Sequence, residues 1–306
     1  NDPYRDASVR GGIPDPKFHE EDIAAFIYGH NRSEDLMVEN VRLHPLYDEY
    51  WADKRADLSA VDIPAYVVAS WTSAIHPRGT LAAFRELGST QKWLRVHNDQ
   101  EWLDGADPDN AEDLARFFDR FLKGIPNDWE TTPRVRLSIL DPGGEDEVGR
   151  PEDDWPLART EWRTLYLSAA DSSLRTTAST DHSVATYDGT DLTASARFSF
   201  VSEEELEITG YLNLHLWVES ETTDMDLFAA VYKEASDGRR LHHITLRGEG
   251  ARDHVRSQER DGKLPATLSY TGPLGRLRIS HRQLDAAAST PAEPVLTHAV
   301  EELVTP

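Results

Sequence analysis

The sequence has no cysteine, few lysines and no long apolar run. Without cysteine the chain cannot form disulfide bonds or thiolate metal sites, and its cellular compartment stays undecided. No stretch reaches the roughly 18 apolar residues that a transmembrane helix needs, so membrane insertion is not expected. The first residues, NDPYRDASVRGG, form neither a signal peptide nor a start at Met.

Basic residues are also scarce. Only six of the 32 are lysine, and 55 residues are Asp or Glu, which leaves a net charge of −23. A surface this acidic repels nucleic acid phosphates and anionic membranes, so neither is expected as a partner. The composition is typical of halophilic proteins, because molar salt shortens the Debye length to roughly 3 Å and screens self-repulsion. A bacterium with a general Arg and Asp bias is the alternative source.

Residues 64–102 carry the most informative pattern. They predict a buried strand at 65–70, a helix at 79–87 and a second strand at 92–96. Each strand is followed by a loop, at 71–78 and at 97–102. Both loops should fall at the carboxyl edge of a parallel sheet, where open α/β sheets hold ligands and catalytic groups. Ordinary surface loops would show the same spacing.

The pattern changes after residue 128. Helices are predicted before it, at 20–28, 33–38, 47–55 and 110–122, the last with Asn110 as N-cap. Strands are predicted after it, at 134–140, 164–168, 194–200, 206–218, 225–232, 241–247 and 276–279. Short strands separated by turns indicate an antiparallel sandwich. We therefore predict a partial α/β domain over 1–125, with a short helical cap at about 15–58, and a β-sandwich over 126–306.

The predicted α/β domain is incomplete. It has only two convincing strands, and two strands do not form an independently stable parallel sheet. The rest of the sheet should come from residues before Asn1 or from another chain.

Metal and cofactor sites are not predicted. The chain has no HxH or HExxH pattern, and the acidic pair Asp224 and Asp226 is a weak calcium signal. His242, His243 and His281 are interpreted as structural histidines. The acidic runs at 145–147 and 203–205 are interpreted as solvated turns.

Several motifs follow one another in a characteristic order. They are DPYRD and GGIP within 2–14, HPLYDEYW at 44–51, ASWTSAIHPRGT at 69–80, KWLRVHNDQEW at 92–102, RFFDRFLKG at 116–124, DMDLF at 224–228 and LRISHRQL at 277–284. Together they resemble the cocaine esterase and X-prolyl dipeptidyl-peptidase type of α/β-hydrolase. The resemblance covers most of the chain. It implies the C-terminal part of an α/β-hydrolase domain followed by a jelly-roll β-sandwich, and hydrolysis through a serine acyl-enzyme without a cofactor.

The resemblance also assigns two triad positions, and both look substituted. Ser73 stands where the family has an aspartate, and Gln100 stands where it has a histidine. A serine hydrolase needs a base and a carboxylate that orients it, and neither Gln nor Ser supplies these. His97 is a candidate substitute base, although its odd offset in an extended segment turns it away from Gln100. The alternative for His97 is a packed histidine at a strand end.

A pocket is predicted around the same loops, lined by Trp71, His76, Glu101 and Trp102. The aromatic residues Tyr47, Tyr50, Trp51, Trp71, Trp93 and Trp102 form the densest aromatic group in the sequence. They would wall an apolar acyl or prolyl pocket, or they would pack as core between sheet and helices.

The nucleophile and the partners follow from the resemblance. The family's serine in a G-x-S-x-G elbow would lie upstream of Asn1, and this sequence contains no such motif. The implied partners are the N-terminal part of the same protein, a small ester or peptide substrate if the protein is active, and a second copy in a homo-oligomer. Three functions stay open: a hydrolase with an altered triad, a non-catalytic protein that binds or assembles, and a carbohydrate-binding jelly-roll.

Overall fold

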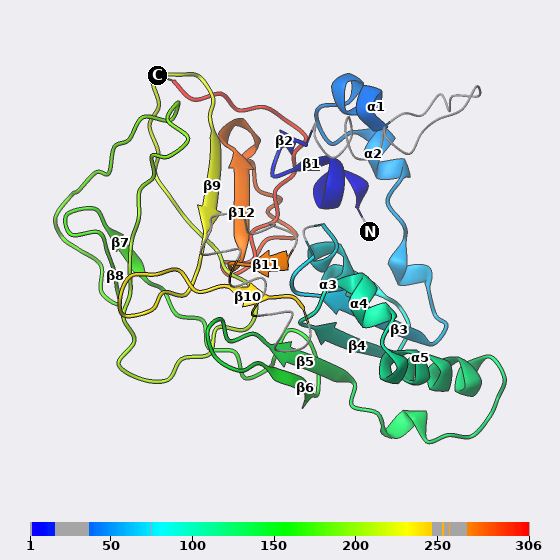
Figure 1. Cartoon of the computed structure of the whole chain (residues 1–306). Coiled ribbons are helices and arrows are strands. Elements are labelled where there is room, and N and C mark those ends of the chain that lie inside the picture. The colour runs from blue at the N-terminus through cyan, green and yellow to red at the C-terminus, as the bar shows by residue number, and fades with distance from the viewer. Residues whose placement is uncertain are drawn as a thin grey trace. The chain divides into compact units, whose positions relative to one another are not determined.

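The computed structural model describes residues 2–15, 37–73, 75–246 and 268–305, together with Asp253 and Ser257 (Figure 1). The chain divides into two compact units. One comprises Asn1–Trp155 and Asn213–Pro306, and the other comprises Pro156–Leu212. The first unit therefore contains both the α/β region and the C-terminal strands. The predicted domain boundary near residue 125 stays a prediction.

A four-stranded mixed sheet forms the centre of the α/β region. Its strands, in spatial order, are β3 (Ala65–Ser70), β4 (Lys92–His97), β5 (Val135–Ile139) and β6 (Glu147–Glu152). β3 and β4 are parallel, with Ser70 opposite His97. This confirms the two strands predicted in this region. Among the described residues β3 pairs only with β4, so its other edge is open.

Strand β5 corrects the predicted sandwich. Its alternating sequence was assigned to the antiparallel part of the chain, but it pairs in parallel with β4 and antiparallel with β6. Val135 and Leu137 are fully buried there. Period-two alternation shows that one face is buried, but it does not show which neighbouring strand supplies the hydrogen bonds.

Helices follow both parallel strands. They are α3 (Pro77–Glu86), α4 (Glu101–Gly105) and α5 (Pro108–Phe121). The predicted N-cap of α5, Asn110, is wrong. Asp107 caps the helix by accepting the N–H groups of Asp109 and Asn110 at 2.9 and 3.3 Å. Pro108 explains the earlier start, because proline suits the first helical position, where its missing N–H is not needed.

Aromatic side chains hold α5 against the sheet. Phe117 on α5 packs with Trp93 on β4 and with Trp129 in a short 3₁₀ turn at Trp129–Thr131. A second cluster lies near the N-terminus, where Tyr4 and Trp51 are fully buried. Trp51 belongs to α2 (Glu49–Asp53), which confirms the helix predicted at 47–55.

Other short helices complete this region. They are a single π-helical turn at Tyr4–Ser8, α1 at Met37–Leu43, and 3₁₀ turns at Leu58–Ala60 and Ile279–His281. The helix predicted at 20–28 lies outside the described residues, as do residues 33–36 of the helix predicted at 33–38. No helix in the described ranges has the length and apolarity to span a membrane.

The other strand pairs among the described residues are antiparallel. They are β1–β2 (Val9–Arg10 and Ile13–Pro14), β7–β8 (Tyr166–Ser168 and Ser173–Arg175), β9–β12 (Asp226–Ala230 and Leu274–Arg278) and β10–β11 (His243–Ile244 and Ser269–Tyr270). The strands predicted at 164–168, 225–232 and 241–247 thus form over shorter spans, and the one predicted at 276–279 begins two residues earlier and ends at Arg278. Residue 247 lies outside the described residues. The mixed sheet and these antiparallel pairs confirm the α/β plus all-β class.

Two predicted strands are wrong. In 194–200 only Ser199 forms a bridge, to Ser173, and 206–218 forms no strand. Both segments alternate in sequence, yet Leu214 and Trp217 are exposed. A strand needs hydrogen bonds to a neighbour as well as alternation, and here no described segment supplies that neighbour.

Candidate active site

Two loops lie side by side where β3 and β4 end. We name residues 71–76 the β3 loop, of which Ala74 lies outside the described residues, and residues 97–102 the β4 loop. The Trp71 N–H donates to the carbonyl of His97 at 3.0 Å, and the Ser70 hydroxyl donates to the carbonyl of Asp99 at 2.7 Å. The parallel register therefore places both loops at one edge of the sheet, as the sequence predicts.

In the β3 loop, Ser73 makes a local contact. Its Oγ accepts the N–H of His76 at 3.3 Å, just before α3 begins. His76 reaches the other loop, because its Nε2 lies 3.8 Å from a carboxylate oxygen of Glu101. Both side chains of this pair are largely exposed, so it stabilises the loops little.

In the β4 loop, Gln100 is buried. Its Nε2 donates to Oγ1 of Thr245, just after β10, at 3.2 Å. The residue also occupies the N-cap position of α4 without a side-chain capping bond. The amide that stands at the predicted base position thus ties the loop to the C-terminal part of the chain.

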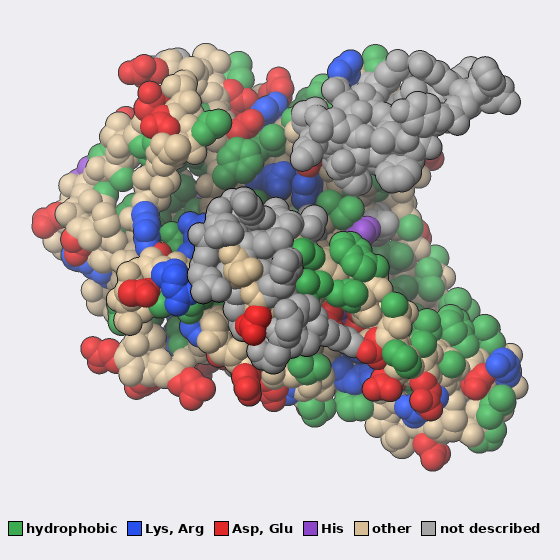
Figure 2. Space-filling model, in the orientation of Figure 1, with side chains coloured by type: hydrophobic (Ala, Val, Ile, Leu, Met, Phe, Trp, Pro, Cys, Tyr) green, Lys and Arg blue, Asp and Glu red, His purple; other side chains and the backbone are tan. Residues whose placement is uncertain are grey.

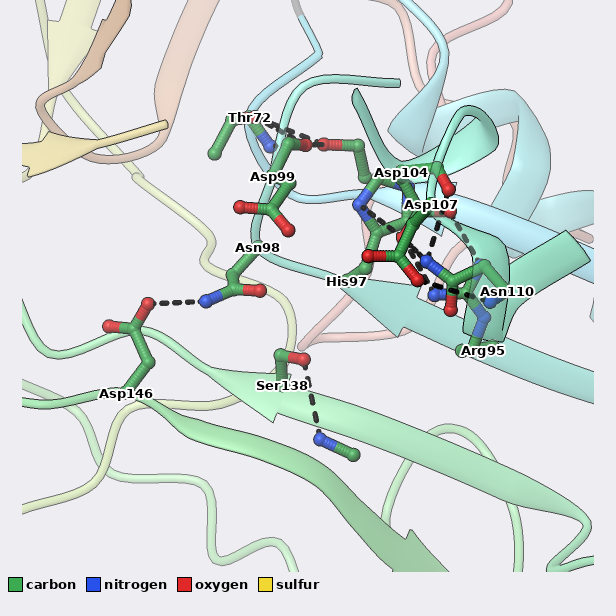
Figure 3. A network of polar contacts seen from close by, with 12 residues as sticks. Thr72, Arg95, His97, Asn98, Asp99, Asp104, Asp107, Asn110, Ser138 and Asp146 are labelled. Carbon is green, nitrogen blue, oxygen red and sulfur yellow. Dashed lines mark hydrogen bonds and ion pairs between the residues drawn. The ribbon is translucent and has the colours of Figure 1, made fainter. Parts of the chain in front are cut away.

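His97 faces a different neighbour from Gln100. It is the last residue of β4, and its Nδ1 lies 3.5 Å from Oδ1 of Asp104 on α4 (Figure 3). Nδ1 is buried and has no hydrogen-bond partner among the described residues. Burial lowers the pKa of His97 below its usual value, although the negative charge of Asp104 acts in the opposite direction.

Asp104 is held by stronger partners than His97. Arg95 donates to both of its carboxylate oxygens, at 2.8 and 2.5 Å, and Asn110 donates to Oδ1 at 2.9 Å (Figure 3). Arg95 and His97 share one face of β4 because they are two residues apart. This largely buried ion pair holds the Asp104 carboxylate beside the face of β4 on which Arg95 and His97 both lie.

Asn98, Asp146 and His243 form a group of polar side chains that the sequence does not predict. Asn98 Nδ2 donates to Oδ2 of Asp146 at 2.6 Å, and His243 Nδ1 lies 3.2 Å from the same oxygen. Asp146 is predicted to lie in a solvated turn, but only 10% of its side chain is exposed. No spacing signal connects three residues from 98 to 243, because the tertiary fold alone brings them together.

The pKa of Asp146 is well below the usual value of an aspartate carboxyl group. Burial by itself would raise its pKa, but hydrogen bonds from His243, Asn98 and the N–H of Asp141 outweigh burial and lower the pKa to about 2. The group therefore carries a full negative charge at neutral pH.

The predicted pocket residues do not share one environment. Trp71 Nε1 donates to the carbonyl of Ser138 on β5 at 2.7 Å, and its ring lies 5.7 Å from that of Trp155. Trp102 is 62% exposed. Trp51 and Trp93 belong to the two separate core clusters. Within the described residues, no group of three or more His, Cys, Asp or Glu side chains could hold a metal ion.

Comparison with known proteins places this geometry in a family. Residues 127–303 match the X-Pro dipeptidyl-peptidase C-terminal non-catalytic domain. The structure is similar to two crystal structures of a CocE/NonD family hydrolase from Staphylococcus aureus, with 30% and 28% sequence identity and TM-scores of 0.87 and 0.84. The matches cover 100% of this chain but 53% and 52% of those chains, so it spans about half their length.

No curated protein matches the chain. The family match covers more than half of the 306 residues, and both structural matches are to hydrolases with the same combination of folds. The chain therefore belongs to the cocaine esterase and X-prolyl dipeptidyl-peptidase family of hydrolases.

Proposed function

We propose that this chain supplies the β3 and β4 loops of a serine-hydrolase-family protein for ester or X-prolyl amide substrates, with a degraded triad. One observation supports this most directly: the Gln100 amide is buried and bonded to Thr245. It has no titratable group and is used for packing. Ser73 is likewise used in a turn contact with His76.

The energetic argument is simple. Acyl transfer to serine needs a base that removes the hydroxyl proton and an acid that orients the base. In a well-studied serine protease, losing the base lowers kcat on the order of 10⁶-fold. A protein with Gln and Ser at these positions would keep the fold and the binding surface and lose nearly all turnover.

Fluorophosphonate labelling and p-nitrophenyl acetate hydrolysis test the proposal, with the full-length protein in molar KCl. We expect no labelling of the native protein and hydrolysis at the background rate. The double variant Ser73→Asp with Gln100→His should gain labelling if an upstream serine is present. Labelling of the native protein would sink the degraded-triad proposal.

His97 supports a second candidate, an active hydrolase with a rebuilt base. The observation in its favour is the carboxylate of Asp104 3.5 Å from Nδ1, because a carboxylate orients the base in such enzymes. If the native protein is active, His97→Gln should abolish labelling, whereas His182→Gln, at an exposed histidine outside both loops, should not. Loss of labelling in both variants would point to a general effect on folding.

The non-catalytic alternative predicts binding or assembly. Among the described residues the outer edge of β3 has no partner strand, and Leu114 and Phe118 on α5 and Leu122 just after it are exposed. Figure 2 shows hydrophobic side chains gathered on the surface at the end of the molecule where α5 lies. We propose that the N-terminal part of the same protein covers this edge and these side chains, since the matched hydrolases are about twice as long as this chain.

Hydrogen exchange tests this partner. Backbone amides of β3 should exchange at least tenfold more slowly in a protein that includes the preceding residues than in residues 1–306 alone, because an added strand protects them (about tenfold per 1.4 kcal/mol of opening free energy). Protection that instead appears with residues 1–306 alone at high concentration, together with a dimer by light scattering, would favour a second copy.

A further inference from the structure

A buried group of three side chains ties the β4 loop to β10. We name Asn98, Asp146 and His243 the clamp. Asp146 Oδ2 accepts the Asn98 amide at 2.6 Å and lies 3.2 Å from His243 Nδ1, while His243 Nε2 lies 2.7 Å from the carbonyl oxygen of Asn98. The side chains of Asn98 and His243 are buried, and that of Asp146 is 10% exposed. The three residues come from the β4 loop, β10 and the β5–β6 turn respectively.

The chemistry of these contacts determines where the protons lie. Both atoms that face the His243 ring are oxygens that only accept hydrogen bonds: an ionised carboxylate and a backbone carbonyl. A neutral imidazole has one N–H and one lone pair. In either neutral tautomer a lone pair would therefore face an oxygen at 3.2 Å or less. Only the doubly protonated ring donates to both.

Both carboxylate oxygens of Asp146 accept hydrogen bonds from neutral donors. Asp146 Oδ1 accepts the N–H of Asp141 at 2.8 Å, and Oδ2 accepts from Asn98. These neutral donors leave the charge of the carboxylate uncompensated. A buried anion without a counter-charge is strongly unfavourable, and a cationic His243 supplies that charge.

We propose that His243 is a buried imidazolium that positions the β4 loop by pinning Asn98 to Asp146. Gln100, two residues further along the loop, makes the second tie through Thr245, also two residues after His243. Asn98 contacts His243 and Gln100 contacts Thr245, so two contacts join the β4 loop to the segment that contains β10. The C-terminal strands thus set the conformation of the β4 loop, whether or not that loop carries a base.

Nuclear magnetic resonance tests the protonation state without any variant. The full-length protein, labelled with ¹⁵N-histidine at neutral pH, should show both ring N–H protons of one histidine as protected from exchange. His243→Gln assigns the signal by removing it. Asp146→Asn should remove the Nδ1 proton and keep the Nε2 proton. A single protected ring proton for His243 in the native protein would overturn the proposal.

Hydrogen exchange tests the positioning role. Amides of residues 97–102 should exchange about tenfold faster in His243→Gln, because a charge-assisted contact to the loop is lost. Thr245→Val should have a smaller effect confined to the end of the loop. His182→Gln, at an exposed histidine in the second unit, is the control and should change nothing.

Unchanged exchange of the β4 loop in a folded His243→Gln variant would show that His243 does not position the loop. If that variant does not fold, Thr245→Val and the native resonance measurement still decide the question. These outcomes do not depend on esterase activity, so failure of the clamp and failure of the proposed function are distinguishable.

Discussion

The β3 and β4 loops leave neighbouring strands at the same edge of the sheet, yet they differ in burial and in partners. His97, Asn98, Asp99 and Gln100 are all buried, and the loop is bonded to β10 and to Thr245 just after it. In the β3 loop, Ser73 makes one local contact and His76 is exposed. Gln100, predicted at the base position, is buried, whereas Ser73, predicted at the acid position, is only half-buried. Substitutions should therefore be costly in one loop and nearly neutral in the other.

The largest effect is expected at Asp104, which supports the β4 loop. Asp104→Ala leaves Arg95 buried without its carboxylate, and breaking a buried pair costs about 3–5 kcal/mol of unfolding free energy. Denaturant unfolding measures the loss. Asp119→Ala removes the carboxylate of a surface pair with Lys123 and is the matched control, with an expected loss of less than about 0.5 kcal/mol. Equal losses of unfolding free energy would show that burial does not make the Asp104 ion pair more stabilising than the Asp119 pair.

Acid should destabilise the protein through Asp146, which bonds to Asn98 of the β4 loop. The pKa of Asp146 is lowered from 3.8 to about 2, so its contribution is complete above pH 5 and is lost as pH falls through 4 to 2. The native protein should lose about 2 kcal/mol more than Asp146→Asn over this range, by the conversion of about 1.4 kcal/mol per pKa unit. Parallel stability curves for the two proteins would contradict the ion pair.

A direct comparison of Gln100 and Ser73, the residues predicted at the base and acid positions, should give a smaller difference in unfolding free energy. Gln100→Ala removes a buried hydrogen bond and leaves the Thr245 hydroxyl with one partner fewer, which costs about 1–3 kcal/mol. Ser73→Ala removes one long contact at a turn and should cost less than about 0.5 kcal/mol. Thermal and denaturant unfolding of both variants measure the two losses of unfolding free energy. A larger loss for Ser73→Ala would reverse the comparison of the loops.

Added salt should change the stability contributed by exposed charges more than that contributed by buried charges. The melting temperature of the native protein should rise strongly from low to molar KCl, because its net charge of −23 is self-repulsive in dilute buffer. His76→Ala should cost less than about 0.5 kcal/mol at low salt and nothing at molar salt, since the pair with Glu101 is exposed. A flat melting temperature would count against halophilic adaptation.

Local features were predictable from the sequence. The strand at 65–70 forms as predicted, although only Ala69 and Ser70 in it are buried and Val68 is exposed. The helix α5 forms as predicted because its apolar face repeats at helical spacing. Which strands pair with one another was not predictable from the sequence. The alternating run at 134–140 gives no sign that it joins β4 in parallel, and the run at 206–218 gives no sign that it lacks a neighbour.

The candidate site divides in the same way. Motif order in the sequence was enough to predict the family and the two loops at one sheet edge, because residue order and strand direction are properties of the chain itself. What each side chain meets was decided by the tertiary structure. Gln100 meets Thr245, His97 meets Asp104, and His243 closes on Asn98 and Asp146, because segments up to 145 residues apart pack against one another. Burial and protonation follow from that packing, which no local pattern records.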